Sequence, residues 1–285
     1  MSNQYFAIDL SSNLCARFAT IVFTGTEGNV AGKYHMIKKG ADDEWNHSSD
    51  RLELGENEVH IWRASLDQNA KVIANLASLL SQDEYERAVK YYHVLNRDRF
   101  IVGRGVLRKI ISAYLSLSPS DLRFTYNEFG KPAVSNDQNG LAINFNLSHS
   151  AELALYAVTR SRVVGIDIEY IREDFATLEI AEHFFSKDEV AALKSLPMDQ
   201  RTTGFFNCWA RKESFIKAKG IGVSYPLNRF TVSLAPTEPA ALLNFDDEGE
   251  VAQWKMFELR PGAGYAAALI ISDPPVILKQ FHWNE

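Results

Sequence analysis

Cysteine is scarce in this chain of 285 residues, and its scarcity argues against two classes of protein. The only cysteines are Cys15 and Cys208, and no Cys-x-x-Cys pair occurs in the sequence. A disulfide framework and a structural zinc site both need several suitably spaced cysteines or histidines. We therefore expect each cysteine to behave as a small, buried apolar residue.

Long hydrophobic runs and an excess of basic residues are also missing. The longest apolar stretches, such as Tyr265 to Ile271, fall far short of the roughly 20 residues that span a bilayer. No basic segment precedes an apolar run at the N-terminus, and Ser2 follows Met1 where myristoylation needs glycine. The formal net charge is -6, whereas nucleic acids and anionic membranes bind basic surfaces. The sequence predicts a soluble cytoplasmic protein that binds neither nucleic acid nor membrane.

Hydrophobic residues make up 46% of the chain, and from residue 58 onward they follow a regular order. Residues 1–57 are polar and rich in glycine, and we treat them as an N-terminal extension of uncertain order. The pattern predicts a strand, two helices and three strands over residues 58–161, and the same order over residues 162–285. This order predicts an α+β fold of two similar halves with a ligand cleft at their interface. A chance recurrence of common elements is the alternative.

Two capping boxes mark helix starts, and the other elements follow from the hydrophobic periodicity. Ser81 with Glu84, and Ser186 with Glu189, have the spacing of a capping box. In the first half the expected elements are 59–64, 81–91, 97–114, 122–126, 141–147 and 153–159. In the second half they are 162–170, 186–196, 200–219, 229–234, 253–259 and 265–271. Residues 277–283 are expected to add an edge strand.

Two carboxylates stand at alternate positions of the expected strand over residues 162–170. Side chains at i and i+2 of a strand share a face, so Asp167 and Glu169 project together, while Ile166 and Ile168 face the core. Two neighbouring, poorly solvated carboxylates repel each other, and a divalent cation that prefers oxygen ligands resolves this conflict. A solvent-facing acidic stripe on an edge strand is the alternative.

The helix expected at 200–219 carries charged residues where a core-facing helix is normally apolar. One face at helical spacing contains Trp209, Lys212, Glu213, Ile216, Lys217 and Gly220. Because Trp209 and Ile216 indicate a partly buried face, the charged residues on it are candidates for a site. A solvated Glu213–Lys217 salt bridge, which stabilises a helix only slightly, is the alternative.

A basic segment extends from Arg87 to Lys109, with seven lysine and arginine residues against one acid, Asp98. In a net-acidic protein, such a segment is the natural place for phosphate groups. Gly103 and Gly105 interrupt the expected helix, and glycines of this kind often permit close approach of another backbone or a ligand. A solvated basic helix face is the alternative.

Two short segments complete the candidate residues. Asn146-Leu147-Ser148-His149-Ser150 ends an expected strand, and Gly130-Lys131-Pro132 forms a tight turn that presents one lysine. Neither segment identifies an activity alone. The G-x-S-x-G pattern that is typical of serine hydrolases is absent from the sequence.

Taken in this order, the patterns resemble the 4'-phosphopantetheinyl transferase superfamily of the surfactin-synthetase-activating (Sfp) type, and most of all its cyanobacterial members. The family pattern is G-x-D-x-E followed by W-x-x-K-E-(A/S)-x-x-K-x-x-G, and residues 165–169 and 209–220 fill it without a gap. Phe184-Phe185-Ser186 matches the segment between these motifs, and both short segments match upstream. The resemblance covers roughly residues 60–271.

This resemblance implies a pseudo-twofold pair of α+β halves with coenzyme A in the cleft between them. It implies that Asp167, Glu169 and Glu213 hold Mg²⁺, or Mn²⁺. It implies that Glu213 and Lys217 are catalytic, with Glu213 as the base directly or through water. The implied coenzyme A or phosphate contacts are Arg87, Arg99, Lys131, Ser148, His149, Lys212 and Lys217. Glu84 departs from the family, in which a lysine can stand at this position.

The implied activity moves 4'-phosphopantetheine from coenzyme A to a serine of an acyl, polyketide or peptidyl carrier protein, with release of adenosine 3',5'-bisphosphate. Because carrier proteins and this chain are both acidic, docking is expected to use a local apolar or basic surface, for which residues 175–193 are the candidate. One complete cleft per chain predicts a monomer. The alternatives are a non-catalytic binding module, which an intact carboxylate trio disfavours, and a metal phosphohydrolase, which the lack of a second metal cluster disfavours.

Overall fold

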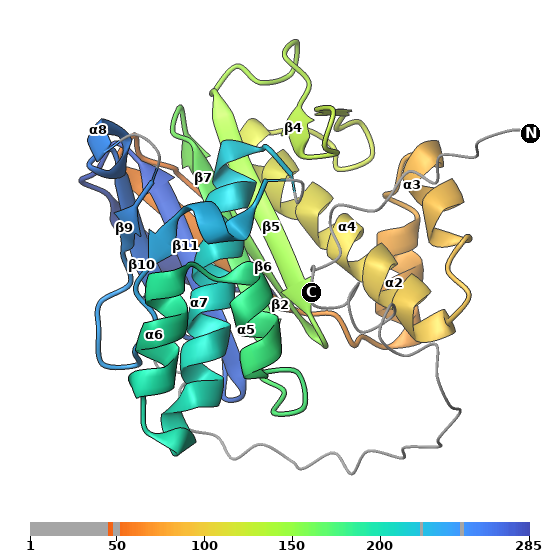
Figure 1. Cartoon of the computed structure of the whole chain (residues 1–285). Coiled ribbons are helices and arrows are strands. Elements are labelled where there is room, and N and C mark those ends of the chain that lie inside the picture. The colour runs from red at the N-terminus through yellow and green to blue at the C-terminus, as the bar shows by residue number, and fades with distance from the viewer. Residues whose placement is uncertain (1–44, 48–51, 223–224, 246–247) are drawn as a thin grey trace, which may run out of the picture.

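Two β-sheets lie edge to edge, and helices cover them in two groups (Figure 1). The computed structural model describes residues 45–47, 52–222, 225–245 and 248–285. Among these, a five-stranded sheet has the order β1-β12-β2-β6-β5, and a three-stranded sheet has the order β10-β11-β7. Helix α7 packs on β7 and β11, whereas α4 packs on β6 and is flanked by α2 and α3. This arrangement is a mixed α+β fold, as predicted.

The strands of the two sheets come from distant parts of the chain. The five-stranded sheet contains β1 (Asn46–His47), β2 (Glu58–Ser65), β5 (Ile143–Ser150), β6 (Leu153–Arg160) and β12 (Ile277–His282). The three-stranded sheet contains β7 (Val164–Tyr170), β10 (Trp254–Leu259) and β11 (Tyr265–Ser272). Two small antiparallel pairs are β3 (Phe124–Tyr126) with β4 (Pro132–Val134), and β8 (Thr231–Val232) with β9 (Leu242–Asn244).

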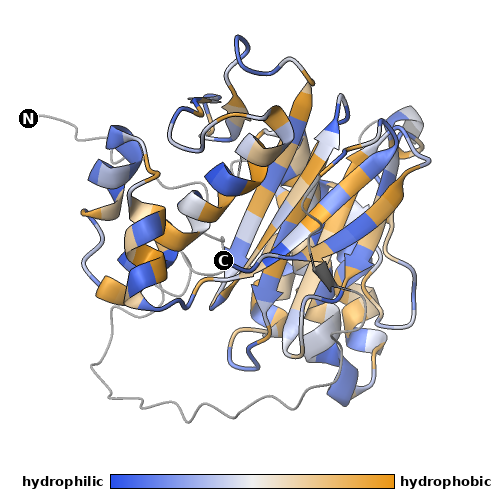
Figure 2. Cartoon of the chain, turned by 180° about the vertical axis from the view of Figure 1, so that it is seen from behind, coloured by the Kyte–Doolittle hydropathy of each residue, from blue (hydrophilic) through white to orange (hydrophobic). Residues whose placement is uncertain are grey.

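The helices of the described residues include two long ones, α4 (Val94–Leu115) and α7 (Met198–Lys219). The shorter helices are α2 (Ala70–Ala77), α3 (Gln82–Ala88), α5 (Leu178–Phe184), α6 (Lys187–Ser195), α8 (Glu248–Val251) and the 3-10 turn η1 (Leu227–Arg229). Along the helices in Figure 2, hydrophilic and hydrophobic residues alternate, as expected for helices with one buried side.

Local sequence signals explain where several helices begin and end. Both predicted capping boxes are confirmed, because the backbone N–H of Ser81 donates to Glu84 at 3.1 Å and that of Ser186 donates to Glu189 at 2.7 Å. Helix α7 ends at Gly220, whose φ of 66° is left-handed, as the sequence predicted.

Helix α4 runs without a break through both of its glycines. A Cβ atom at Gly105 would stand 2.6 Å from the Cβ of Leu76, so this glycine permits the close approach of α2. The prediction that a helix glycine marks a close approach is therefore confirmed at Gly105, where the neighbour is a packed helix. The short elements β1, α2, β4, α5, η1, β9 and α8 were not predicted from the sequence.

Strand β12 corrects the predicted organisation of the C-terminal residues. It lies between β1 and β2, parallel to both, and is not an edge strand. Consequently part of the segment 162–285 belongs to the same sheet as residues 58–161, and a boundary at residue 161 does not separate two sheets. Trp45, from the predicted extension 1–57, is buried and donates from Nε1 to the carbonyl of Arg260 at 3.1 Å.

The two sheets share one buried apolar layer. Its members include Val59, Ile61, Leu155 and Ala157 of the first sheet and Val164, Ile166, Ile168, Leu269 and Ile271 of the second. Because both sheets bury side chains in this layer, they are held in a fixed relation to each other. Cys208 is buried, as expected, and Cys15 lies outside the described residues. Among the described residues, no helix has the length and apolar character needed to cross a bilayer.

Candidate active site

Strand β7 and helix α7 lie unusually close together at Gly165. A Cβ atom here would stand 2.0 Å from the carbonyl oxygen of Ser214 and 2.6 Å from the backbone nitrogen of Ala218. Only glycine therefore allows the helix to lie this close to the strand. This approach brings Glu213 and Lys217 of the helix into the neighbourhood of the strand's carboxylates.

The two carboxylates of β7 are buried, with exposed fractions of 0% for Asp167 and 2% for Glu169. They pair in register with Ala268 and Ala266 of β11, so small side chains flank them within the sheet. A solvent-facing acidic stripe is therefore excluded. The two carboxylates lie instead inside the protein, where charge without a compensating partner is costly.

Strands β5 and β7 are the neighbouring edge strands of the two sheets, and polar side chains join them (Figure 1). Ser148 Oγ donates to Asp167 Oδ1 at 2.8 Å, and Ser150 Oγ donates to Glu169 Oε2 at 3.2 Å. Asn146 Oδ1 accepts from the backbone of β7 at 2.8 Å. Alternate residues of β5 thus hold both carboxylates. Both serines belong to the candidate segment 146–150, but only Ser148 was predicted as a coenzyme A or phosphate contact. Their i, i+2 spacing in a strand places both side chains on one face.

Helix α7 contributes the next part of the site. Lys217 Nζ donates to Ser148 Oγ at 2.8 Å and to Asp167 Oδ1 at 2.6 Å. Glu213, one helical turn earlier, lines with Lys217 a cavity of about 70 Å³ whose other walls include residues 129–132 and 146–147. The site therefore combines side chains from before and after residue 161, as a cleft between the two predicted halves requires.

The carboxylates of this site fit a bound cation. Asp167 Oδ2 and Glu169 Oε1 are buried and accept no hydrogen bond from the residues that the structure describes. Burial raises the pKa of Asp167, and burial together with the charges of Asp167 and Glu213 raises the pKa of Glu169 well above its ordinary value. A cation with oxygen ligands would relieve both the repulsion and the unmet hydrogen bonding.

As the side chains stand, no three His, Cys, Asp or Glu residues in the described part of the chain are arranged to hold one metal ion. Asp167 is paired with the ammonium group of Lys217 at 2.6 Å. Glu169 nevertheless interacts electrostatically with both Asp167 and Glu213, so the three carboxylates share one buried region. A metal centre made of these three residues needs their side chains to turn toward one another.

Positive charges gather around His149, the residue after Ser148 on β5. Burial, followed by the charges of Lys217, Arg99, Arg104 and Arg87, lowers the pKa of His149 to about 4. The imidazole is therefore neutral at pH 7 and is able to both donate and accept a hydrogen bond. Because the charges come from α3, α4 and α7, they form one electropositive wall beside the buried carboxylates.

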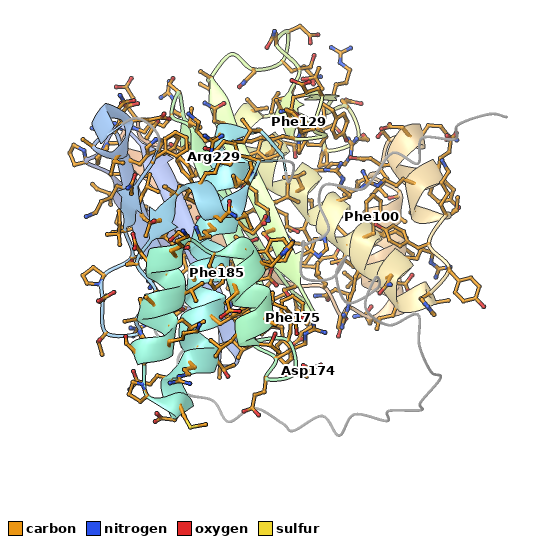
Figure 3. All side chains as sticks on the ribbon, in the orientation of Figure 1. Phe100, Phe129, Asp174, Phe175, Phe185 and Arg229 are labelled. Carbon is orange, nitrogen blue, oxygen red and sulfur yellow. The ribbon has the colours of Figure 1, made fainter. Side chains whose placement is uncertain are left out.

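Two arginines of this wall are already in contact with protein groups. Arg99 forms a bidentate pair with Asp67, with an Nε–Oδ1 distance of 2.6 Å and an Nη2–Oδ2 distance of 2.9 Å. The Arg87 guanidinium lies 5.3 Å from the ring centroid of Phe100, which Figure 3 labels. A phosphate bound here would compete with Asp67 for Arg99. Arg87 also interacts with the side chain of Tyr91.

Lys131 does not reach the carboxylates. Its Nζ donates to the carbonyl oxygens of Lys217 at 2.7 Å and Ala218 at 3.1 Å, at the C-terminal end of α7. Burial lowers the pKa of Lys131 to about 8. A cation at this position satisfies free carbonyls and the helix dipole. This contact ties the 130–132 turn to α7, and Lys131 also lines the cavity beside Glu213 and Lys217, so its predicted coenzyme A contact stays a prediction.

Lys212 lies in the core and not at the cleft. It is fully buried, its Nζ is 2.8 Å from Glu189 Oε2, and it donates to the carbonyl of Leu227 at 2.7 Å. From the sequence, Lys212 and Glu213 were predicted to share one face of the helix. Because α7 is buried over residues 204–216, Lys212 turns toward α6 and η1 instead of toward the cleft. We do not retain it as a coenzyme A contact.

The phenylalanines of the candidate docking segment 175–193 pack in the core or against it. Phe175 and Phe185 are 7% and 3% exposed, and their ring centroids lie 5.7 and 6.2 Å from that of Trp209. Both are labelled in Figure 3, beside the helices α5 to α7. Phe184 packs on Trp209 as well, at 5.5 Å. The expectation that at least one phenylalanine of Phe184 and Phe185 belongs to the core is confirmed.

Family models match both segments that build this site. Residues 163–270 match a model described as the 4'-phosphopantetheinyl transferase superfamily, and residues 61–161 match one described as 4'-phosphopantetheinyl transferase, N-terminal. With the relatives described next, these matches show that the chain belongs to the 4'-phosphopantetheinyl transferase superfamily and is an enzyme of this class.

Individual relatives cover most of the chain. The 4'-phosphopantetheinyl transferase HetI of Nostoc sp. is 38% identical over 80% of this chain and 93% of HetI. The 4'-phosphopantetheinyl transferase Sfp of Bacillus subtilis is 33% identical over 73% of this chain and 90% of Sfp. A putative 4'-phosphopantetheinyl transferase of Synechocystis sp. is 31% identical over 69% of this chain and 77% of that protein. The predicted family, including its likeness to cyanobacterial members, is confirmed.

Proposed function

We propose that this protein transfers the 4'-phosphopantetheine arm of coenzyme A to a serine hydroxyl of an apo acyl, polyketide or peptidyl carrier protein. The products are the holo carrier protein and adenosine 3',5'-bisphosphate, and Mg²⁺, or Mn²⁺, is the required metal ion. The buried network of Ser148, Asp167 and Lys217 at the β5–β7–α7 junction is the observation that supports this proposal most. The relatives HetI and Sfp carry the same activity in their names.

Coenzyme A presents a pyrophosphate and a 3'-phosphate, which together need a strongly positive site. The wall around His149 supplies such charges from Arg87, Arg99 and Lys217. We assign the pyrophosphate to Lys217, Ser148 and His149, and the 3'-phosphate region to Arg87 and Arg99. The neutral imidazole of His149 adds a hydrogen bond without adding charge.

Asp167, Glu169 and Glu213 are the residues that would hold the metal ion, since all three carboxylates are buried in one region. When bound, a divalent cation neutralises charge on the phosphates and stabilises the leaving oxygen. The buried carboxylate oxygens without hydrogen bonds, Asp167 Oδ2 and Glu169 Oε1, are the atoms that favour this assignment. Ser148 and Ser150 hold the opposite oxygens of the same carboxylates and so orient them.

The transfer step is a substitution at phosphorus. The serine oxygen of the carrier forms a bond to the phosphorus that bears the pantetheine, while the bond from this phosphorus to the bridging oxygen breaks. The hydroxyl proton passes to Glu213, directly or through water. The bridging oxygen leaves with the bonding electron pair on adenosine 3',5'-bisphosphate, where the ammonium group of Lys217 balances the developing charge.

We also propose that the two halves are related by a pseudo-twofold axis and that the enzyme acts as a monomer. The support for the first point is the recurring order of a strand, three helices and further strands, with a capping box at the second helix of each half. The support for the second point is that one chain supplies both sides of the cavity beside Glu213 and Lys217.

Transfer is tested by incubating the protein with Mg²⁺, coenzyme A and several apo carrier proteins in parallel, and measuring the mass of each carrier. We expect a mass gain of one phosphopantetheine group on at least one carrier, and its loss in Asp167→Ala. The conservative control is Lys109→Gln, which changes a surface residue that pairs with Glu285. Binding of carrier without transfer would indicate a binding module, and loss of coenzyme A without carrier would indicate a hydrolase; either result contradicts the proposal.

A further inference from the structure

The turn between β3 and β4 is built around the side chain of Asn127. Asn127 Oδ1 accepts from the backbone N–H of Phe129 at 3.0 Å and from that of Lys131 at 2.8 Å. The backbone of Asn127 adds two bonds, since its carbonyl accepts from Gly130 at 2.9 Å and its N–H donates to the carbonyl of Lys131 at 3.1 Å. Asparagine suits such turns because its side chain hydrogen-bonds the backbone two residues further on. One residue thus fixes the path of residues 127–131, which we call the 127–131 turn.

The 127–131 turn also binds the C-terminal end of α7, which belongs to the second half of the chain. Asn127 Nδ2 donates to the carbonyl of Gly220 at 3.1 Å, immediately after the last residue of the helix. Lys131 Nζ donates to the carbonyls of Lys217 and Ala218 at 2.7 and 3.1 Å. The last carbonyls of a helix have no partner within the helix, so these donors satisfy them. The turn therefore joins the two halves through three carbonyls.

Glycines after α7 allow the turn to pack closely against this end of the helix. Gly220 and Gly222 both have a left-handed φ, of 66° and 69°. A Cβ atom at Gly222 would stand 2.7 Å from Cδ1 of Phe129, which Figure 3 labels. At Gly220 a Cβ atom would stand 3.3 Å from Asn127 Nδ2. The turn therefore contacts the segment after α7 with an apolar ring as well as with polar side chains.

This contact forms part of the wall of the cavity beside the candidate base. The lining of the cavity includes residues 129–132, Gly220 and Gly222 after α7, and Glu213 and Lys217 of α7 itself. Asn127 is not among the described residues that line it. Asn127 therefore acts on the cavity indirectly, by holding the turn against the helix that carries Glu213 and Lys217.

We propose that Asn127 is a positioning residue for coenzyme A, because it holds the 127–131 turn in place as a wall of the cavity before coenzyme A binds. The inference rests on the proposed transferase function, which places coenzyme A at Lys217, a residue of the same cavity. A wall that is ordered in advance removes the entropy cost of ordering it during binding. Helix α7 keeps its place without the turn, since its residues 204–216 are buried in the core. Asn127 thus governs the affinity for coenzyme A more than the chemical step.

The test removes the side-chain hydrogen bonds of Asn127 in two ways. Asn127→Ala removes all of them, and we expect the Kd for coenzyme A, measured by calorimetry without carrier, to rise about tenfold. The KM for coenzyme A should rise with it, while kcat and the KM for the apo carrier change by less than about twofold. Asn127→Asp keeps an acceptor for Phe129 and Lys131 but has no donor for Gly220, so we expect a similar rise in Kd. Because salt screens the added charge, the ratio of this Kd to that of the wild type should persist at about 0.5 M salt.

Asn139→Ala is the matched control. Asn139 also shapes a turn of the first half, since its Nδ2 donates to the carbonyl of Ile143 at 3.0 Å and its Oδ1 accepts from the N–H of Ile143 at 2.6 Å. Both contacts stay within the first half, so their loss loosens a turn without changing the contact with α7. We expect Asn139→Ala to keep the wild-type Kd for coenzyme A. Hydrogen exchange of residues 127–131 should be faster in Asn127→Ala and unchanged in Asn139→Ala.

The outcomes separate this inference from the proposed function. If the wild type modifies a carrier and Asn127→Ala, folded by circular dichroism, keeps the wild-type Kd for coenzyme A, the positioning role is overturned and the function stands. Equal increases of Kd in Asn127→Ala and Asn139→Ala, or a wild-type Kd in Asn127→Asp, would overturn it as well, because the link to α7 would then not matter. If the wild type binds coenzyme A with the expected effect of Asn127→Ala but modifies no carrier, the positioning role stands and the proposed function falls. If it binds no coenzyme A, both fall.

Discussion

The helix pairs α3–α4 and α6–α7 are joined by similar contacts, although the two pairs differ in sequence. In the first pair, the capping-box residue Glu84 accepts from the backbone of Ser81 at 3.1 Å and from Arg108 Nε at 2.6 Å. Arg108 then donates to the carbonyls of Pro119 at 2.9 Å and Leu122 at 2.8 Å, in the segment after α4. One buried ion pair thus connects the start of α3, the middle of α4 and the chain that follows.

The second pair repeats these contacts with a lysine in place of the arginine. Glu189 accepts from the backbone of Ser186 at 2.7 Å and lies 2.8 Å from Lys212 Nζ. Lys212 donates to the carbonyls of Leu227 at 2.7 Å and Phe230 at 2.5 Å, in the segment after α7. The glutamate, the cation and the two carbonyls therefore have counterparts in each half, which supports the proposed relation between the halves.

The difference between the halves lies in the residues next to these pairs. The residue after Lys212 is Glu213, which lines the cavity beside the carboxylates, whereas the residue after Arg108 is Lys109, which pairs with Glu285 near the surface. The corresponding ion pairs therefore stand beside residues with different roles. In the first half the ion pair holds helices together, and in the second half it also fixes the helix that presents the candidate base and lysine.

The largest expected effect is the loss of kcat when Glu213 is changed, because Glu213 is the candidate base. In Glu213→Gln the side chain keeps its shape but loses its charge and its capacity to accept a proton, so we expect kcat to fall by roughly 10²–10⁴-fold. Lys109→Gln, at the corresponding place in the first half, should leave kcat unchanged. Steady-state transfer to an apo carrier measures both variants. Equal kcat values for Glu213→Gln and the wild type would contradict the one-sided assignment of the chemistry.

The next effect is a loss of stability when the buried cation of either helix pair is removed. Lys212→Met leaves the buried Glu189 without its cation, so we expect it to lower the free energy of unfolding by about 3–5 kcal/mol. Arg108→Met removes the nearer of two cations from Glu84, since Arg104 Nε lies 3.7 Å from Glu84 Oε1, and we expect a smaller loss. Urea denaturation followed by circular dichroism measures this loss. Among molecules that remain folded, Lys212→Met should reduce kcat for transfer far more than Arg108→Met does, because Glu213 follows Lys212 directly. Similar kcat losses in both variants would contradict a positioning role that is confined to the second half.

The capping boxes illustrate what the sequence could predict. Ser81 with Glu84, and Ser186 with Glu189, lie within one helical turn, so the local pattern was sufficient. The partners of the glutamates could not be predicted in the same way, since Arg108 lies 24 residues from Glu84. Arg108 was counted in a basic segment for phosphates, and Lys212 was assigned to coenzyme A. The sequence shows that such cations are present, but not whether each one meets a ligand or a buried carboxylate.

Long-range pairing limited the rest of the prediction in the same way. The Gly165–Glu169 pattern predicted a strand with two carboxylates on one face, and its family resemblance identified the enzyme class. The pairing of β12 with β2 joins residues about 219 positions apart, such as Ile277 with Glu58, and no local pattern distinguishes this strand from an edge strand. Lys131 was likewise placed by motif, whereas its contact with the end of α7 depends on the packing of two distant segments.

The smallest expected effect is a change in the free energy of unfolding when a glycine of α4 is replaced by alanine. Gly105 lies against α2, where an added Cβ would be 2.6 Å from the Cβ of Leu76, whereas at Gly103 it would be 3.6 Å from the nearest atom, Leu66 Cδ2. We expect Gly105→Ala to lower the free energy of unfolding by about 1–3 kcal/mol through overpacking. Gly103→Ala should raise it by up to about 1 kcal/mol, because alanine favours a helix over glycine.

Both variants should retain the wild-type kcat when folded, since the close approach at Gly105 serves helix packing, whereas the one at Gly165 brings α7 to the carboxylates. Denaturant titration gives the stabilities, and the transfer assay gives kcat on the same samples. A Gly105→Ala variant as stable as Gly103→Ala would show that α2 moves aside without cost. A lower kcat in folded Gly105→Ala would show that the packing of α4 on α2 affects the active site. It would contradict the view that the close approach at Gly105 serves helix packing alone.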